Sequence, residues 1–170
     1  LRYGGDFAVG AYGIVNTFAM LAVLLILGVC QGMQPIAGYN YGAQQYQRVN
    51  AVLKLAIIGA TIMTTLTFLI GEFIPELAVR LFTTDEGLIS RAAEGFRIVV
   101  LVFPIVGFQM VTSNFFQSIG MANKAIFLSL TRQLLFLLPC LIILPTFLGA
   151  SGIWWSMPIS DAIASIVAGI

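Results

Sequence analysis

The sequence predicts an all-α fold, a polytopic transmembrane bundle of about five antiparallel helices. Of the 170 residues, 59% are hydrophobic and 9% are charged, and the mean hydropathy is +1.00. A soluble domain of this length cannot bury so much apolar surface. Long apolar runs recur along the chain, and residues 7–47 contain no charged side chain. Because the connections between runs are short, successive helices are expected to be antiparallel neighbours.

Each apolar run is predicted to be a helix. Crossing the hydrocarbon takes about 20 apolar residues, and lipid leaves no backbone group without a hydrogen bond. Between the second and third runs, charges at nearly helical spacing are typical of a short amphipathic segment at the membrane surface. The predicted helices cover residues 7–39, 51–73, 90–119, 123–147 and 153–170.

Composition argues against several classes of protein. The net charge of +1 provides no basic surface for nucleic acid. The sequence has no His, and Cys30 and Cys140 both lie inside apolar runs, so neither a metal site nor a redox pair is expected. No Gly-rich phosphate loop and no intramembrane cluster of carboxylates is found. We therefore expect no enzyme, no metal and no cofactor, with the lipid bilayer as a partner.

Two ionisable residues lie deep within predicted helices. Arg132 and Asp161 lie about eight or nine residues into their helices, roughly 12 to 14 Å from the helix starts. An unpaired charge at such depth costs several kcal/mol, so each needs a partner, water or the bundle interior. We predict that they form an ion pair. Its role is either structural or a part in proton or cation coupling.

Neutral polar side chains provide further candidates for a substrate or ion pathway. Gln109, Thr112 and Phe116 follow helical spacing and could line a cavity with polar and aromatic groups. Such surface suits a polyspecific pocket, whereas hydrogen bonding between helices is the alternative. The pathway candidates are Gln31, Gln34, Gln109, Thr112, Asn114, Phe116, Arg132 and Asp161.

Proline and glycine are expected to bend or loosen the helices. A proline removes one backbone hydrogen bond and displaces a carbonyl, which either shapes the bundle or permits bending during transport. The segment 31–50, rich in Gly, Gln and Tyr, is interpreted as a membrane exit and loop. The hinge or kink candidates are Pro35, Gly38, Gly42, Pro104, Pro139 and Pro158.

Four blocks of sequence together resemble one family. In chain order they read QPIAGYNYGAQQYQRV, LFTTDEGLI, FFQSIGMANKAIFLSLTRQLLFLLPCLIILP and GIWWSMPISDAI. Their order and spacing resemble the C-terminal half of MATE (multidrug and toxic compound extrusion) transporters. The resemblance implies a secondary active transporter, a multidrug efflux antiporter that exchanges amphipathic or cationic drugs for Na⁺ or H⁺ by alternating access.

The same resemblance implies how this chain fits into such a protein. Residues 1–170 would form part of a six-helix C-terminal lobe, with its first helix and the N-terminal lobe outside the sequence. The protein would lie in a bacterial inner membrane. The turns at 31–50 and 120–124 would face the cytoplasm, and the turns at 83–90 and 148–152 would face the outside. In some members, acids in the seventh and tenth helices bind the coupling cation. No acid lies between Ile98 and Asn123, so that type of site is not expected.

Two alternatives stay open. A lipid-linked saccharide flippase of the same superfamily would share the architecture, although its cavity would favour more cationic residues than Arg132. The second alternative is a membrane scaffold subunit that does not transport.

Overall fold

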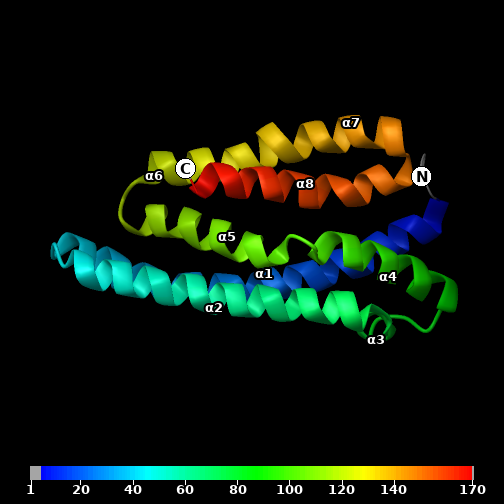
Figure 1. Cartoon of the computed structure of the whole chain (residues 1–170), viewed down its shortest axis with the longest axis horizontal. Helices are drawn as coiled ribbons and strands as arrows, with labels where there is room; N and C mark the ends of the chain where they lie inside the picture. The colour runs from blue at the N-terminus through cyan, green and yellow to red at the C-terminus, as the bar shows by residue number, and fades with distance from the viewer. Residues whose placement is uncertain (1–4, 170) are drawn as a thin grey trace.

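The computed structural model describes residues 5–169, and within that range every element is a helix, which confirms the predicted all-α fold (Figure 1). Residues 1–4 and residue 170, the last residue of the fifth predicted helix, lie outside the described range. The elements are α1 (Gly5–Gly42), α2 (Tyr46–Phe73), α3 (Pro75–Arg80), α4 (Glu86–Val100), α5 (Phe103–Ser118), α6 (Ala122–Leu130), the π-helix η1 (Thr131–Leu137), α7 (Leu138–Leu148) and α8 (Ala150–Gly169).

The first two helices are longer than predicted. α1 continues through Pro35 to Gly42 rather than ending at residue 39, and α2 begins at Tyr46 rather than at residue 51. Hydropathy marks only the part of a helix that lies in lipid, whereas backbone hydrogen bonding extends the helix through polar residues into water. Between them, Gln44 adopts a positive φ of 57°, which turns the chain back on itself.

The predicted helix 90–119 is two helices. α4 and α5 meet at an angle of 53°, and the break lies at residues 101–102, where Val102 leaves helical geometry. Pro104 occupies the first turn of α5, where its missing N–H interrupts no helical bond. The proline therefore starts a new helix at this point rather than kinking one in the middle.

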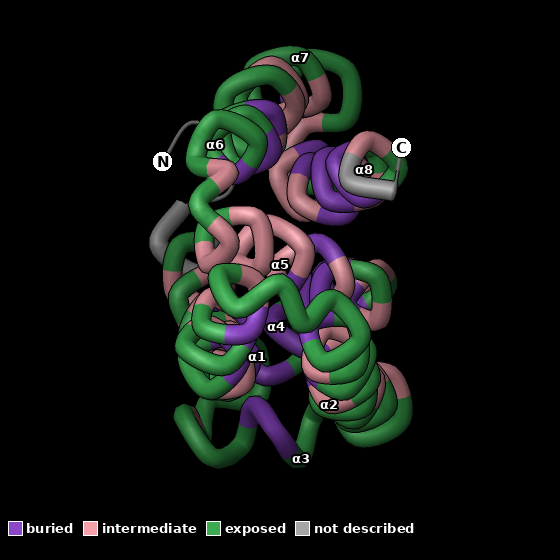
Figure 2. The backbone as a smooth tube through the Cα atoms, turned by 90° about the vertical axis from the view of Figure 1, so that its left-hand side faces the viewer, coloured by how far each residue is buried: buried purple, intermediate pink, exposed green. Residues whose placement is uncertain are grey.

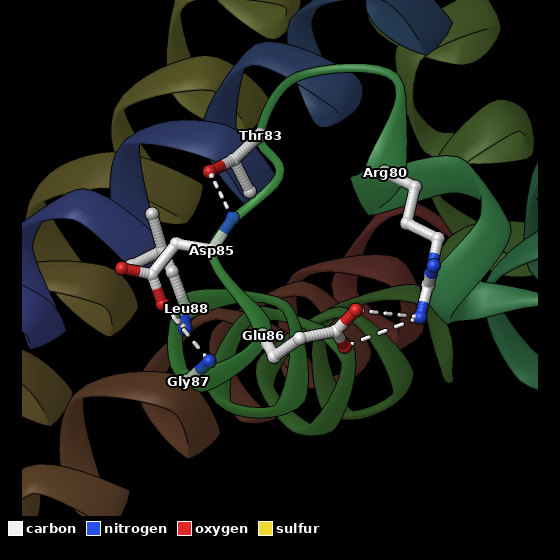
Figure 3. A network of polar contacts seen from close by, with 6 residues as sticks. All are labelled: Arg80, Thr83, Asp85, Glu86, Gly87 and Leu88. Carbon is white, nitrogen blue, oxygen red and sulfur yellow. Dashed lines mark hydrogen bonds and ion pairs between the residues drawn. The ribbon is translucent and has the colours of Figure 1, made fainter.

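α4 also begins four residues earlier than predicted, because Asp85 caps it. The Asp85 Oδ1 accepts hydrogen bonds from the backbone N–H groups of Gly87 (2.9 Å) and Leu88 (3.1 Å) (Figure 3). On the surface beside this cap, Arg80 forms an exposed ion pair with Glu86 at 3.0 Å (Figure 3). These polar contacts lie in the segment predicted to be amphipathic, in which α3 is the short helix.

α6, η1 and α7 follow one another without a break and take the place of the predicted helix 123–147. Pro139 lies in the first turn of α7, directly after the π-helical segment. A proline cannot donate to the carbonyl one turn upstream, and a wider turn is one way in which a helix in lipid accommodates this loss. Pro158 lies inside α8, which continues through it.

The helices lie side by side along one long axis (Figure 1). α1 and α2 form one side of the bundle, α6 to α8 form the other, and α4 and α5 run between them (Figures 1 and 2). The α1–α2 and α5–α6 turns lie at one end, and α3 and the α7–α8 turn lie at the other (Figure 1). This is the antiparallel order that short connections predict.

Buried residues lie on the sides of the helices that face one another, and exposed residues lie on the outside (Figure 2). Many of the exposed residues are large and apolar. Phe96 and Ile26 are buried at 1% and 0% exposure, each within its own core cluster. In contrast, Leu24, Leu55 and Ile142 are 61%, 70% and 61% exposed. Such an outer surface is unfavourable in water and suits the hydrocarbon of a bilayer.

Three helical stretches in the described part of the chain are long and apolar enough to cross a membrane, and the bent pair α4–α5 can provide a fourth. α8, which takes the place of the fifth predicted span, is not among them. It nevertheless runs antiparallel to α7 along the bundle (Figure 1). The three stretches are Val9–Gly42, Tyr46–Phe73 and Ala122–Leu148.

Candidate functional site

A polar cavity of about 110 Å³ lies between α5 on one side and α6 and η1 on the other. Polar side chains in a membrane-spanning region are costly, so a cluster of them around a cavity is the first place to look for function. The lining residues are Gln109, Met110, Ser113 and Asn114 of α5, together with Ser129, Arg132 and Gln133 of α6 and η1.

Helical geometry explains why these side chains converge. Gln109 and Ser113 are four residues apart, and so are Ser129 and Gln133, so each pair lies on one face of its helix. The two faces meet where the Ser113 and Ser129 hydroxyl oxygens are 3.1 Å apart. This contact joins α5 to α6 at the edge of the cavity.

Gln109 is the most deeply buried polar side chain of this lining, at 3% exposure. Its Oε1 has no hydrogen-bond partner among the described residues. Leaving a buried amide oxygen unpaired costs about 1 to 3 kcal/mol, so native structures seldom do so without a reason. Gln109 therefore brings unused hydrogen-bonding capacity to the cavity.

Arg132 connects the cavity to α8. Its Nε donates a hydrogen bond of 2.7 Å to the Oδ1 of Asp161, and the two side chains are 29% and 11% exposed. The ion pair expected from the depths of the two residues is therefore present. Breaking such a pair is expensive, because the remaining charge is left desolvated.

A further hydrogen bond connects the cavity to α1. The Gln34 Nε2 donates to the Oδ1 of Asn114 at 3.1 Å, while the Asn114 Nδ2 donates to the carbonyl oxygen of Met110 at 2.9 Å. Hydrogen bonds between polar side chains of neighbouring helices stabilise helix packing within lipid. The cavity thus brings together Gln109, Asn114 and Arg132 from the predicted candidates, and Gln34 and Asp161 each join it through one hydrogen bond.

The other three candidates lie elsewhere. Gln31 is exposed on α1. Thr112 donates to the carbonyl oxygen of Phe108 in its own helix at 2.8 Å, and the ring of Phe116 lies 5.3 Å from the Lys124 Nζ. Of the predicted stripe of Gln109, Thr112 and Phe116, only Gln109 lines this cavity.

Sequence reasoning missed four lining residues, namely Met110, Ser113, Ser129 and Gln133. A signal for two of them existed, because Ser113 follows Gln109 by four residues and Gln133 adjoins Arg132. Spacings of three and four residues are equally compatible with one helical face, so the sequence did not distinguish Thr112 from Ser113.

The hinge candidates occupy varied positions. Pro35 is exposed and lies within an unbroken α1. Gly38 lies against α5, where a Cβ atom would come within 2.9 Å of the Ser118 carbonyl oxygen. Gly42 is the last residue of α1, and a Cβ there would meet no atom within 4 Å. Gly38 is thus a point of close helix contact.

Metal-binding side chains do not gather in this structure. Over the residues that it describes, no three His, Cys, Asp or Glu side chains lie close enough to share a metal ion. Chemistry at the cavity therefore comes from amides, hydroxyls and one buried ion pair. Such groups bind and orient a ligand by hydrogen bonding.

Comparison with known proteins finds a family model and curated relatives that agree with one another. A family model described as MatE matches residues 1–143. The chain is 24% identical over 168 residues to "Multidrug export protein MepA" of Staphylococcus aureus (strain N315), and 21% identical over 164 residues to the protein of that name from Staphylococcus saprophyticus. These alignments cover 99% and 96% of the chain. The chain spans only 37% and 36% of the length of the two relatives.

Solved structures share the fold. The chain is 38% identical to the MATE multidrug transporter DinF-BH, solved in complex with a ligand, with a TM-score of 0.86 over 98% of this chain and 37% of that one. A MOP superfamily transporter from Pyrococcus furiosus superposes with a TM-score of 0.88 at 23% identity, over 98% of this chain and 38% of that one, which is evidence of fold alone.

The matched proteins are named as transporters and export proteins, which confirms the expectation that the chain is not an enzyme. The family, together with the apolar helices, makes it an integral, multi-pass membrane protein. The match to the family model extends over most of the chain, from the start of the sequence into α7. The chain therefore belongs to the MATE family of transporters.

Proposed function

We propose that this chain forms the greater part of the C-terminal lobe of a multidrug efflux antiporter in a bacterial inner membrane. The observation that carries the proposal is the buried Arg132–Asp161 pair beside a polar cavity, within a helix bundle of this family. A structural bundle in lipid has no need of a cavity that contains an unpaired amide oxygen. A transporter needs such groups to bind and release its cargo.

The proposed substrates are amphipathic, often cationic, drugs. Relatives that share about a third of their length with this chain are named multidrug export proteins, and one solved relative is a multidrug transporter in complex with a ligand. The long apolar helices supply the apolar part of such a pathway, and the cavity supplies a few oriented polar groups. The remaining part of the pathway is proposed to lie in an N-terminal lobe.

The proposed coupling ion is H⁺ or Na⁺, and Asp161 is the residue proposed to respond to it. Either ion competes with the Arg132 guanidinium for the carboxylate, so binding of the ion weakens the ion pair. Weakening the pair loosens the connection between η1 and α8, which suits a lobe that alternates between two conformations. Among the described residues the other ion pair, Arg80–Glu86, is exposed on the surface.

The flippase alternative is less well supported. A pyrophosphate needs several cationic or strongly donating partners, whereas the cavity holds a single guanidinium that Asp161 already neutralises. The scaffold alternative explains the helix packing but not the cavity.

The test is drug efflux by the full-length protein in cells that lack their own efflux pumps. We expect overexpression to reduce accumulation of a cationic dye severalfold, and Asp161→Asn to abolish most of that reduction while the protein remains in the membrane. Glu94→Gln, at an exposed position of α4, is the matched control and should change nothing. Varying external Na⁺ and pH separately identifies the ion. Dye accumulation that is unaffected by overexpression would contradict efflux.

A further inference from the structure

We infer that the cavity between α5 and η1 is a binding site for the carboxylate group of a substrate. The inference rests on the proposed transport function and goes beyond it, because amphipathic cations need no site for an anion. It would allow the protein to handle drugs that carry a carboxylate besides an amine. The argument starts from the unused edge of Arg132.

Only one donor atom of the Arg132 guanidinium is engaged. Its Nε bonds to Asp161, and among the residues that the structure describes nothing accepts a hydrogen bond from Nη1 or Nη2. The guanidinium is planar with five N–H donors, and the edge formed by its two Nη atoms matches a carboxylate with two parallel hydrogen bonds. Because Arg132 lines the cavity, this free edge is available to a ligand there.

Gln109 supplies the second, independent observation. Its side chain is 97% buried, lines the cavity and leaves its amide oxygen without a partner. That oxygen is an acceptor and cannot pair with an anion, whereas the amide NH₂ group donates to no other described residue and is therefore free to donate to one. A carboxylate in the cavity could thereby accept hydrogen bonds from both Gln109 and Arg132.

The rest of the lining is suited to a negative ligand. Apart from Met110, every lining side chain carries an N–H or O–H donor, and no acid is among them. Asp161 is not a lining residue, and its carboxylate lies at the Nε of Arg132 rather than at the free edge. The volume of about 110 Å³ accommodates a carboxylate group, since a water molecule takes about 30 Å³.

Two dyes provide a matched pair of probes. Rhodamine 6G is a cationic ethyl ester, and hydrolysis of that ester gives a zwitterionic free acid with the same ring system. Fluorescence anisotropy with the purified full-length protein at neutral pH gives both dissociation constants. We expect the free acid to bind about tenfold tighter than the ester, as suits one additional bidentate ion pair.

Substitutions test whether the preference for the free acid over the ester arises in this cavity. Gln109→Glu places a carboxylate in the cavity, which repels the carboxylate of the free acid, and should abolish the preference for the acid. Gln117→Glu, the same substitution two turns along α5 at an exposed position, should leave the preference intact. The double variant Arg132→Gln/Asp161→Asn retains the net charge and should bring the ratio of the two dissociation constants to about one.

Each result decides the inference. Equal binding of the two dyes by the unmodified protein would overturn the inference and leave water as the occupant of the cavity. An equal effect of Gln109→Glu and Gln117→Glu on the preference would overturn it as well. If Gln109→Glu does not fold, the double variant and the unmodified protein still decide. Efflux of the ester without preferential binding of the acid would refute the carboxylate site but leave the proposed function standing. Absence of both binding and efflux would refute both.

Discussion

Asp161 illustrates how much one side chain contributes in this bundle. The residue is 8% exposed, and its carboxylate provides the partner for Arg132. Removing one member of a buried pair leaves the other charge desolvated and unpaired, whereas removing both charges is often tolerated. This asymmetry distinguishes a buried ion pair from a surface pair such as Arg80–Glu86, whose side chains are 52% and 72% exposed.

We predict that Asp161→Ala lowers the free energy of unfolding by about 3 to 5 kcal/mol, because Arg132 loses its buried partner. The double variant Arg132→Gln/Asp161→Asn should recover most of that loss. Equilibrium unfolding of the purified full-length protein in detergent measures both values. A double variant that is as unstable as Asp161→Ala would contradict this account of the pair.

Glycine at residue 38 allows a close contact between helices. An added Cβ would lie 2.9 Å from the carbonyl oxygen of Ser118, a backbone atom that cannot rotate away. We predict that Gly38→Ala destabilises the protein by about 1 to 3 kcal/mol through overpacking. Gly42→Ala, where a Cβ meets nothing within 4 Å, is the control and should leave stability unchanged or raise it by up to about 1 kcal/mol. Equal effects at the two positions would refute the contact argument.

Among the elements, α4 shows how local chemistry sets the start of a helix. Asp85 accepts from two backbone N–H groups that have no partner inside the helix, while Glu86 forms only an exposed pair with Arg80 (Figure 3). A cap of this type contributes about 1 kcal/mol, and an exposed ion pair contributes between about 0 and 1 kcal/mol. The cap is therefore the stronger determinant of where α4 begins.

We predict that Asp85→Ala increases amide hydrogen exchange in the first turn of α4 by about fivefold, as suits a loss of about 1 kcal/mol. Glu86→Gln should change exchange by less than twofold, because solvent screens the pair that it breaks. Mass spectrometry of peptides that cover the first turn of α4 provides the measurement. A larger effect of Glu86→Gln would show that the ion pair, rather than the cap, holds this turn.

The helices on both sides of the bend between α4 and α5 make close contacts with their neighbours. α4 lies against α8, where a Cβ on Gly95 would clash with the Trp154 ring, and α5 lies against α2, where a Cβ on Gly107 would come within 3.1 Å of the Ala60 carbonyl group. The two halves of the predicted single helix both pack against α1, α2 and α8, while α4 also contacts α3 and α5 also contacts α6. Pro104 alone does not account for the bend, because it lies at a position where helices begin.

The molecule as a whole has two ends that can be tested for orientation. The α1–α2 turn and the α3–α4 connection lie at opposite ends of the bundle (Figure 1). The charge of the loops does not decide which end faces the cytoplasm, whereas the family resemblance implies a cytoplasmic α1–α2 turn, and we propose that orientation. Gln44 and Thr84 are exposed in these two connections, and the native thiols Cys30 and Cys140 lie in apolar helices, buried and partly buried respectively.

We predict that an impermeant maleimide labels Thr84→Cys in intact cells and labels Gln44→Cys only after the membrane is opened. The reason is that the bundle places the two residues on opposite sides of the bilayer. Gel-shift labelling of the full-length protein measures this, with the unmodified protein as the control for Cys30 and Cys140. The reverse pattern would invert the proposed topology, and labelling of both residues in intact cells would refute a spanning bundle.

Much of this architecture was predictable from the sequence, because burial in lipid is a property of each segment by itself. A run of apolar residues long enough to cross the hydrocarbon must form a helix wherever its neighbours lie, so hydropathy predicted the all-α bundle. Depth along a helix is equally local, and it predicted that Arg132 and Asp161 would be partners. The four blocks of sequence, taken together with their order and spacing, indicated the family.

Tertiary packing alone decided which faces of the helices meet. The sequence permitted either Thr112 or Ser113 to share a face with Gln109, and contact with α6 selected Ser113. It permitted a continuous helix over residues 90–119, whereas the folded chain breaks at residues 101–102 and bends by 53°. The physical reason is the same in both cases. Hydropathy reports how much of a side chain leaves water, whereas the rotation of one helix against another depends on side chains far away in the sequence.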